Sequence, residues 1–288
     1  MDIRSPSLNR LLDSWLDEDL GRGDLTSIAL NQNGSAYWIA KQAGVFCGGT
    51  LVERIFQRLD PSVEVNLLLQ DGEYFQTAQR LLDLKGPAAS LASGERTALN
   101  LAMRLSGIAT ATATLVKELE GTSVRLADTR KTTPGLRVIE KYAFQCGGGI
   151  NHRFGLDDAA MLKENHIAWA GSITRALQRI KTAAPWPSKI IVEVETPKQA
   201  EEAINAGADG ILLDEISPEV LVDLVPKLRA LASSRDNLES SNQIVLEASG
   251  VDPKEIRTFA ETGINLISTS APMTRSTWID FSMRFRTL

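Results

Sequence analysis

The stretch KIIVEVETP at residues 189–197 decides the fold. It is an apolar run rich in β-branched residues that ends in Glu195 and leads into a helix start, with Thr196 as the N-cap and Pro197 in the first turn. The same unit recurs twice, each time with a polar residue before a proline: 210–214 with Ser217 and Pro218, and 243–249 with Asp252 and Pro253. Apolar strands that alternate with helices predict a parallel sheet covered by helices.

The series of strands extends to both sides of these units. Apolar runs at residues 124–128 and 264–268 read as a first and a last strand, and Gly207 and Gly263 stand where helices should end. No GxGxxG follows any run, so a complete or partial βα barrel explains the series better than an open doubly wound sheet. A barrel gathers the carboxyl ends of its strands in one mouth, so we expect the polar residues that end the runs to meet there: residues 128–131, Glu195, Asp214 and Ser249.

The first hundred residues predict a different, mixed α and β segment. We expect a helix at 8–16, strands at 36–41 and 63–69, and a helix at 93–106 that ends at Gly107. The tail after Ala271 alternates apolar and polar residues like a strand, and we expect it to return to this segment. The predicted domains are therefore residues 1–107, joined by the tail 272–288, and residues 108–271.

The composition is that of an ordinary globular protein. Apolar residues make up 43% and charged residues 23% of the 288 residues, which excludes a disordered or fibrous chain. The net charge of −5 argues against a nucleic-acid surface. The start of the chain carries no apolar signal block, so we expect a cytoplasmic protein without a membrane partner. The cysteines at 47 and 146 lack CxxC spacing and are expected to be reduced structural thiols.

Basic and titratable side chains concentrate in one part of this acidic chain. Residues 125–166 hold seven Lys or Arg against five Asp or Glu, a balance of +2 that leaves −7 for the remainder, and they hold both histidines. Within this window, DTRKTTPG at 128–135 places an arginine fork and a lysine beside a turn, and CGGGINHR at 146–153 adds a glycine-rich stretch. Each alone also fits a solvated or flexible loop. Together they favour a site for a small polyanion.

These motifs, in this order and spacing, resemble the quinolinate phosphoribosyltransferase family. The segments that carry the resemblance are ERTALN at 95–100, TRKTTPG at 129–135, KYAFQCGGGINHR at 141–153, LKENH at 162–166, VEVE at 192–195, ILLD at 211–214 and EASG at 247–250. It runs from residue 17 to residue 285, essentially the whole chain. The fold that it implies is an α/β protein, an incomplete βα (TIM-like) barrel with an N-terminal α/β sandwich domain.

The resemblance also implies the reaction and the assembly. Quinolinate and phosphoribosyl pyrophosphate would give nicotinate mononucleotide, pyrophosphate and CO2 in NAD biosynthesis, with Mg2+ as cofactor. The enzyme would be a homodimer, or a higher oligomer, whose active sites are shared between subunits. Two alternatives stay open: a related phosphoribosyltransferase of the molybdate-transport-associated branch that uses a different base, and a homologue that binds a metabolite without turnover.

Residue roles follow from the same resemblance. The residues expected to bind quinolinate are Arg96 (from the partner subunit), Thr129, Arg130, Lys131, His152, Arg153 and Lys163. Lys131, Glu195 and Asp214 are expected to be catalytic, and Glu195 and Asp214 to hold Mg2+ directly or through water. The phosphoribosyl and phosphate groups are expected to contact the same two acids and two loops, whose residues are Ser249, Gly250, Val251, Thr269, Ser270 and Ala271. We assign His166 to structure, and Arg96 can alternatively pair along its own helix.

Two positions depart from the family pattern. The family usually has glycine where this chain has Val251 and Ser270, both in the expected phosphate loops. A Cβ restricts backbone angles and close approach, so the fit of the phosphate is in question at these positions.

Overall fold

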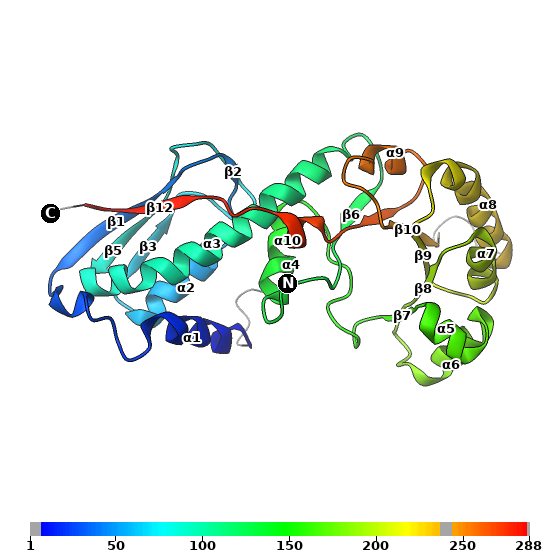
Figure 1. The fold of residues 1–288 in the computed structure, drawn as a ribbon, viewed down its shortest axis with the longest axis horizontal. Coiled ribbons are helices and arrows are strands. Elements are labelled where there is room, and N and C mark those ends of the chain that lie inside the picture. Colours follow the sequence, from blue (N-terminus) through cyan, green and yellow to red (C-terminus); the bar gives the residue numbers. More distant parts are fainter. Residues whose placement is uncertain (1–6, 237–243, 287–288) are drawn as a thin grey trace. The chain divides into compact units, whose positions relative to one another are not determined.

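The computed structural model describes residues 7–236 and 244–286. The chain forms two compact units (Figure 1). Unit 1 comprises Met1–Thr114, Thr132–Gly148 and Pro272–Leu288, and unit 2 comprises Leu115–Lys131 and Gly149–Ala271. The predicted domain border at residue 107 lies inside a helix of the structure, and that border stays a prediction.

Unit 1 is built on an antiparallel sheet of strand order β12-β1-β5-β3. Its strands are β1 (Asn33–Ala40), β3 (Glu64–Leu67), β5 (Arg80–Pro87) and β12 (Phe281–Arg286), and β2 (Gly44–Val45) pairs separately with β4 (Tyr74–Phe75). The tail strand β12 pairs over its whole length with β1, from Ser35 opposite Arg286 to Ala40 opposite Phe281. The predicted return of the tail to the first segment is therefore confirmed. The strand β5 was not predicted.

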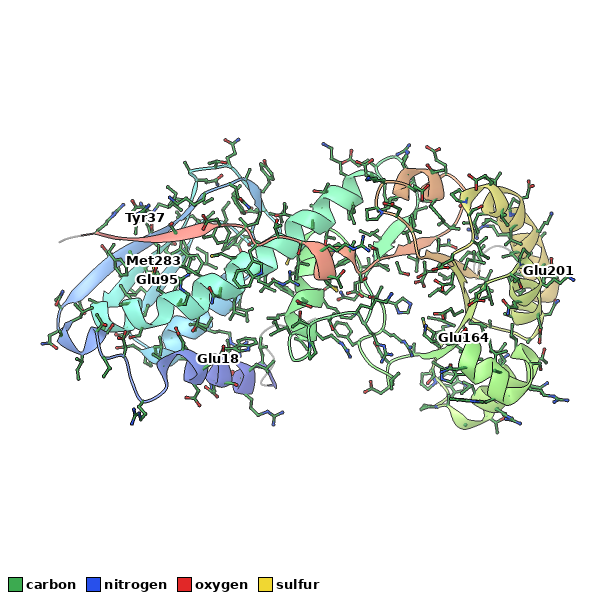
Figure 2. All side chains as sticks on the ribbon, viewed as in Figure 1. Glu18, Tyr37, Glu95, Glu164, Glu201 and Met283 are labelled. Carbon is green, nitrogen blue, oxygen red and sulfur yellow. The ribbon has the colours of Figure 1, made fainter. Side chains whose placement is uncertain are left out.

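An aromatic core fixes this sheet. Phe281 of β12 contacts the rings of Trp38, Phe46 and Phe75, with ring centroids 5.5–6.3 Å apart, and all four side chains are buried. Tyr37 and Met283, labelled in Figure 2, lie on the neighbouring strands β1 and β12. The helices of unit 1 are α1 (Ser7–Leu20), α2 (Gly49–Leu59), α3 (Ala88–Lys117, which continues into unit 2) and α4 (Arg137–Cys146), with a 3-10 turn at Ser27–Ala29.

The helix α3 does not end at Gly107, so that prediction is wrong. The helix continues for ten residues to Lys117, and Gly107 is buried in its interior. A Cβ at Gly107 would lie 2.2 Å from the backbone oxygen of Thr277. The glycine is therefore required by close packing of the tail on the helix, a tertiary constraint that the local pattern does not contain. The helix α3 is long and apolar enough to cross a membrane, but the core helix of a globular protein meets the same criteria. The buried face of α3 includes Leu91, Ala98, Leu105 and Ile108.

Unit 2 is the incomplete barrel that the sequence predicted. Its six strands are parallel and lie in the order β6-β11-β10-β9-β8-β7, so the first strand of the series pairs with the last. Among the described residues β6 and β7 are not paired, and the sheet stays open between them. The strands are β6 (Arg125–Ala127), β7 (Ala160–Leu162), β8 (Ile190–Val194), β9 (Gly210–Asp214), β10 (Val245–Ser249) and β11 (Leu266–Ser268). The short strand β7 was not predicted.

Helices cover the outer face of this sheet (Figure 1). They are α5 (Glu164–Ala170), α6 (Ile173–Ala183), α7 (Pro197–Asn205), α8 (Pro218–Asp236) and α9 (Ile256–Ala260). The last helix, α10 (Ala271–Arg275), belongs to unit 1 from Pro272 onward. The predicted start of α7 is confirmed, because the Thr196 hydroxyl caps the amide of Gln199 and Pro197 is the first helical residue. The predicted start at Asp252 is wrong: its carboxylate accepts the Lys254 amide in a turn, and α9 begins later, at Ile256.

A buried ion pair links three segments of unit 1. Glu140 of α4 is fully buried, and its carboxylate accepts hydrogen bonds from the Arg104 guanidinium and from both the amide and the hydroxyl of Thr133, each at 2.9 Å. Arg104 of α3 also donates to the backbone oxygen of Met273. Removing one partner of a buried pair leaves the other charge uncompensated in a low-dielectric interior.

We therefore expect Arg104→Met to lower the free energy of unfolding by about 3–5 kcal/mol, measured by urea denaturation of the full chain. Arg10→Met is the matched control, since Arg10 is exposed on α1 and its replacement should change stability by less than about 0.5 kcal/mol. Equal stability of the two variants would contradict the role given to the pair.

Candidate active site

The strand register of unit 2 sorts the polar side chains of the barrel into layers. Glu193 of β8 is opposite Leu212 of β9, which is opposite Glu247 of β10. Parallel neighbours in register point to the same face, so the two glutamates share one layer inside the barrel. Two residues nearer the carboxyl ends, Asp214 is opposite Ser249. Glu195 follows β8 at this upper level, so the predicted acids lie at neighbouring strand ends.

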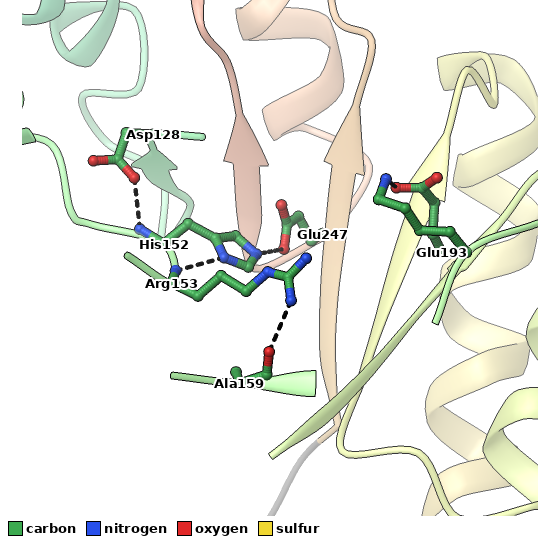
Figure 3. Close-up of polar contacts among 7 residues, drawn as sticks. Asp128, His152, Arg153, Ala159, Glu193 and Glu247 are labelled. Carbon is green, nitrogen blue, oxygen red and sulfur yellow. Dashed lines mark hydrogen bonds and ion pairs between the residues drawn. The ribbon is translucent and has the colours of Figure 1, made fainter. Parts of the chain in front are cut away.

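Cationic side chains gather beside the layer of Glu193. The ammonium of Lys163, just after β7, forms an ion pair with the Glu193 carboxylate (Figure 3). Arg153 donates from Nη1 to the backbone oxygen of Ala159 at 2.8 Å. Burial lowers the pKa of the Arg153 guanidinium, and the nearby positive charge of Arg130 lowers it further, against the opposing charges of Glu193 and Asp158. The structure therefore brings Lys163 and Arg153 to Glu193, and it places Arg130 close enough to Arg153 for their charges to interact.

His152 is held on all sides by polar contacts. Its amide donates to Asp128 at 2.8 Å, its Nδ1 accepts the amide of Arg153 at 2.7 Å, and its Nε2 lies 3.2 Å from Glu247. A nitrogen that accepts a hydrogen bond carries no proton, so we assign the ring proton to Nε2, which donates to Glu247. Both ring nitrogens are thus engaged within the chain, and the expected contact of His152 with a substrate carboxylate stays a prediction.

Two structural residues place the clamp side chains. His166 accepts the amide of Lys163 on its Nδ1 at 3.1 Å, at the start of α5, so the ring fixes the residue whose ammonium meets Glu193. Asp128 is fully buried after β6 and also accepts the side-chain amide of Asn151 at 2.6 Å. It ties the segment that carries His152 and Arg153 to the first strand of the barrel.

The segment after Asp128 carries the next predicted residues. Thr129 and Arg130 are half-buried and Lys131 is exposed. The Thr129 hydroxyl accepts the amide of Lys131 at 3.0 Å, a local turn that fixes the backbone at the strand end. The hydroxyl is therefore used at least partly within the loop.

The predicted phosphate loops lie at the carboxyl ends of the paired strands β10 and β11. Gly250 has φ +75°, and a Cβ there would lie 3.0 Å from Glu215, so this position requires glycine. Among the described non-glycine residues only Ala78 and Glu215 have positive φ. Val251 and Ser270 therefore adopt ordinary backbone angles, and neither needs the freedom of glycine. The hydroxyl of Thr269 accepts the amide of Ala271 at 3.1 Å, which closes the second loop.

Arg96 belongs to unit 1, whereas the other predicted site residues belong to unit 2. Its side chain lies on the exposed side of α3, between the half-buried Glu95 and the buried Thr97. Burial raises the pKa of the Glu95 carboxyl, and the charge of Arg96 opposes that shift. In the described residues Arg96 has no ion pair within hydrogen-bonding range, so its guanidinium is available to a ligand.

Three residues of this site were missed from the sequence: Asp128 as an anchor, Glu193 and Glu247. The alternation of VEVE and the polar residue inside VLEAS were the available signals, because a charge within an apolar strand must face a partner or a cavity. Glu195, which was chosen in place of Glu193, is exposed.

A cavity of about 760 Å³ adjoins the cluster. It shares His152, Arg153 and Glu247 with the site, but its other walls are at the amino ends of the strands, at Ile191, Gly210 and Val245 among others. Lys163 and Arg130 do not line it. We therefore place the candidate site at the carboxyl ends, where the charged groups converge, and regard the cavity as the underfilled lower part of the barrel.

Comparisons with known proteins agree with this geometry. Residues 24–106 match the family model "Quinolinate phosphoribosyl transferase, N-terminal domain", and residues 108–284 match that of the C-terminal domain. The chain is 44% identical over 276 residues to a probable carboxylating nicotinate-nucleotide pyrophosphorylase of Synechocystis sp., covering 95% of this chain and 90% of that one. A similarly named protein of Bacillus subtilis is 43% identical, with coverages of 91% and 87%. The crystal structure of NadC from Streptococcus pyogenes superimposes with a TM-score of 0.91 at 35% identity, covering 100% of this chain and 99% of that one.

The hydrogen bonds of His152 and His166 give a prediction for solution. Because both Nδ1 atoms accept backbone amides, long-range ¹H–¹⁵N correlation spectra at neutral pH should show both rings as Nε2–H tautomers. These are the only two histidines of the sequence, so His166→Gln assigns the spectrum. An Nδ1–H tautomer at His152 would show that the contacts assigned to its ring are wrong.

Proposed function

The chain belongs to the quinolinate phosphoribosyltransferase family, and we propose that its unit 2 joins quinolinate to phosphoribosyl pyrophosphate. The activity is that of a carboxylating nicotinate-nucleotide pyrophosphorylase, a pentosyltransferase of NAD biosynthesis. The products are nicotinate mononucleotide, pyrophosphate and CO2.

The observation that carries this proposal is the group of cations at Glu193: Lys163 forms an ion pair with it, Arg153 interacts with its charge, and Arg130 lies near Arg153. Asp158 also acts on Arg153, but its carboxylate is exposed and accepts the Phe154 amide, so we count it with the solvated loop. Arg130, Arg153 and Lys163 against Glu193 then leave an excess of +2, which a dicarboxylate dianion would neutralise. Nicotinate, with a single carboxylate, would leave one partly buried cation without a counter-charge, and such a group is costly. The cluster therefore favours a pyridine dicarboxylate as the acceptor.

The chain's own residues contribute mainly by positioning. Arg153 is held by Ala159, and Lys163 by Glu193 and His166, so a dicarboxylate bound between them would have one fixed orientation. Its ring nitrogen then attacks C1 of the ribose as the bond from C1 to pyrophosphate breaks. Such fixed approach contributes about 7–11 kcal/mol in favourable intramolecular reactions. No side-chain nucleophile is required.

Loss of CO2 follows from the first step. Once the ring nitrogen is bonded to C1, it carries a positive charge next to C2. When the bond between C2 and its carboxylate breaks, this charge stabilises the electron pair left at C2, which then takes a proton from solvent. The cations that hold the remaining carboxylate keep the ring in place during this step.

Glu195 and Asp214 fit a magnesium ion and the ribose hydroxyls. Glu195 follows β8 and Asp214 ends the neighbouring strand β9, on the face of the sheet that points into the barrel. Among the described residues neither carboxylate has a hydrogen-bond or ion-pair partner. Carboxylate oxygens are the ligands that Mg2+ prefers, usually with several waters. When bound, Mg2+ would neutralise the charge of the leaving pyrophosphate. Lys131, exposed beside Arg130, would serve the phosphate groups and the substrate carboxylate.

The 5′-phosphate fits the loops after β10 and β11. Ser249 ends β10 and Gly250 follows it, while Thr269 to Ala271 follow the neighbouring strand β11, so the two loops leave adjacent strand ends. The ordinary backbone angles of Val251 and Ser270 support this assignment, since the two departures from the family pattern cause no strain. The Ser270 hydroxyl would add a donor.

The assembly and location complete the proposal. We place Arg96 in the active site of a second copy, so the enzyme would be a cytoplasmic homodimer, or a higher oligomer, with shared sites. Its support is the exposed position of Arg96 on α3 without an ion-pair partner among the described residues.

A product assay tests the function. Full-length protein incubated with quinolinate, phosphoribosyl pyrophosphate and Mg2+ should form nicotinate mononucleotide, CO2 and pyrophosphate in equal amounts. Nicotinate in place of quinolinate should give little product. Absence of the mononucleotide with quinolinate, or comparable turnover with nicotinate, would contradict the proposal.

The roles of the two acids predict a separation of effects. We expect Asp214→Asn and Glu195→Gln to lower kcat/KM for phosphoribosyl pyrophosphate by roughly 100-fold, the loss typical of one transition-state stabilising group, while quinolinate binding to the free enzyme stays normal. Steady-state kinetics at several Mg2+ concentrations and calorimetry measure the two effects. Glu201→Gln, an exposed carboxylate on α7 (Figure 2), is the matched control. If the variants lost affinity for quinolinate while their kinetics with phosphoribosyl pyrophosphate stayed normal, the role given to the two acids would be wrong.

The shared site is tested by complementation. Arg96→Ala and Lys163→Ala are each expected to be inactive alone, and mixing them under subunit exchange should restore up to about a quarter of the wild-type activity, because half of the dimers then hold one intact site. If verified heterodimers stay inactive, Arg96 acts within its own subunit.

A further inference from the structure

Unit 1 gathers three potential metal ligands from distant parts of the sequence. Cys47 precedes α2, Asp71 lies in the turn between β3 and β4, and Cys146 is the last residue of α4. Their ligand atoms, two sulfurs and a carboxylate oxygen, all lie within 4.8 Å of one another. Cys47 is completely buried and the other two residues are half-buried. The function proposed above makes no use of this group.

Each of the three residues is held in place by its surroundings. The Cys47 backbone is fixed on both sides by Ser106 of α3, whose hydroxyl accepts the Cys47 amide at 3.0 Å and donates to its oxygen at 3.3 Å. Oδ1 of Asp71 accepts the amides of Gly48 and Gly49, each at 2.9 Å. These contacts occupy the backbone of one residue and one oxygen of another, and they do not involve the Cys47 sulfur or Oδ2 of Asp71.

Tyr142 and Gly72 complete the surroundings of the cluster. The Tyr142 hydroxyl donates to Oδ2 of Asp71 at 2.7 Å and so orients the carboxylate. Gly72 packs directly on Cys146, where a Cβ would lie 3.3 Å from the Cys146 oxygen, and its φ of +94° requires glycine. Oriented ligands with a hydrogen-bonded carboxylate are the arrangement that metal sites use around their first ligands.

We propose that Cys47, Asp71 and Cys146 bind one soft divalent cation, Zn2+, with water in the fourth position. In a tetrahedral site with Zn–S near 2.3 Å and Zn–O near 2.0 Å, neighbouring ligand atoms lie about 3.5–3.8 Å apart. The three atoms, already within 4.8 Å, need only a small approach. Two thiolates select Zn2+ over Mg2+, which takes oxygen ligands. This site is therefore chemically distinct from the acids proposed for Mg2+.

Binding replaces protons and links segments. Zn2+ takes the place of the two thiol protons, which pass to the buffer, and the carboxylate binds without a proton change. Because the ligands are far apart in sequence, the cation would join the start of α2, the β3–β4 turn and the end of α4. The expected role is stabilisation of unit 1, independent of the chemistry in unit 2.

The test uses reduced, metal-free, full-length protein titrated with Co2+ in excess Mg2+. We expect a thiolate-to-cobalt charge-transfer band that saturates at one Co2+ per chain and is lost when Zn2+ is added, with Zn2+ also protecting both thiols from alkylation. Cys47→Ala and Cys146→Ala should abolish the band. Asp71→Asn, which keeps an oxygen for the Gly48 and Gly49 amides, and Tyr142→Phe should each weaken binding about 10–100-fold.

Asp17→Asn, which changes an exposed carboxylate on α1 of the same unit, should leave binding unchanged. The conservative variants Asp71→Asn and Tyr142→Phe keep both cysteines, so they test the site even where a cysteine variant fails to fold. The proposal would be overturned by a missing charge-transfer band or by a band that survives Cys146→Ala. It would also be overturned if the two thiols oxidised to a disulfide and Zn2+ did not protect them from alkylation.

Discussion

The register between the parallel strands of unit 2 is the constraint on which the site depends. Side chains of a strand alternate between two faces, so a single pairing decides which residues enter the barrel. The pairing of Leu212 with Glu193 on one side and Glu247 on the other places two carboxylates inside, and the same register sets Asp214 beside Ser249. A slip of one residue would turn these groups toward the covering helices and fill the barrel with Val194, Leu213 and Ala248.

The charges inside the barrel follow from that register. Glu193 holds Lys163 and moderates the repulsion between Arg130 and Arg153, and Glu247 fixes the His152 ring. A buried charge persists only with a partner, so the two glutamates make a cluster of cations tolerable in the free protein. The resulting excess of positive charge at the carboxyl ends is what a dicarboxylate would neutralise, and the unpartnered acids at the next level suit a metal and a sugar. In the proposed function, the layers of one sheet would therefore hold the dicarboxylate at one level and the metal and sugar at the next.

Much of this architecture was predictable because its signals are local. The apolar runs of β6 and of β8 to β11, the cap and proline at Thr196 and Pro197, and the alternating tail of β12 are written in consecutive residues. The sequence could not show that Gly107 serves the approach of Thr277, because that contact joins residues far apart in the chain. Glu193 was not recognised for a similar reason: it has the same strand parity as Glu195, and only pairing with β7 and Lys163 shows that it meets the cations. Likewise, no local pattern links Cys47, Asp71 and Cys146.

The central claim is that the cation cluster recognises two carboxylates at once. Titration calorimetry of quinolinate, pyridine-2-carboxylate and nicotinate into the free enzyme tests it most directly, because binding is measured without the later steps. The account predicts that quinolinate binds at least tenfold tighter than either monocarboxylate, about 1.4 kcal/mol, and that Arg153→Met removes this preference. Equal affinities for the three ligands, or a preference for quinolinate that survives Arg153→Met, would contradict it.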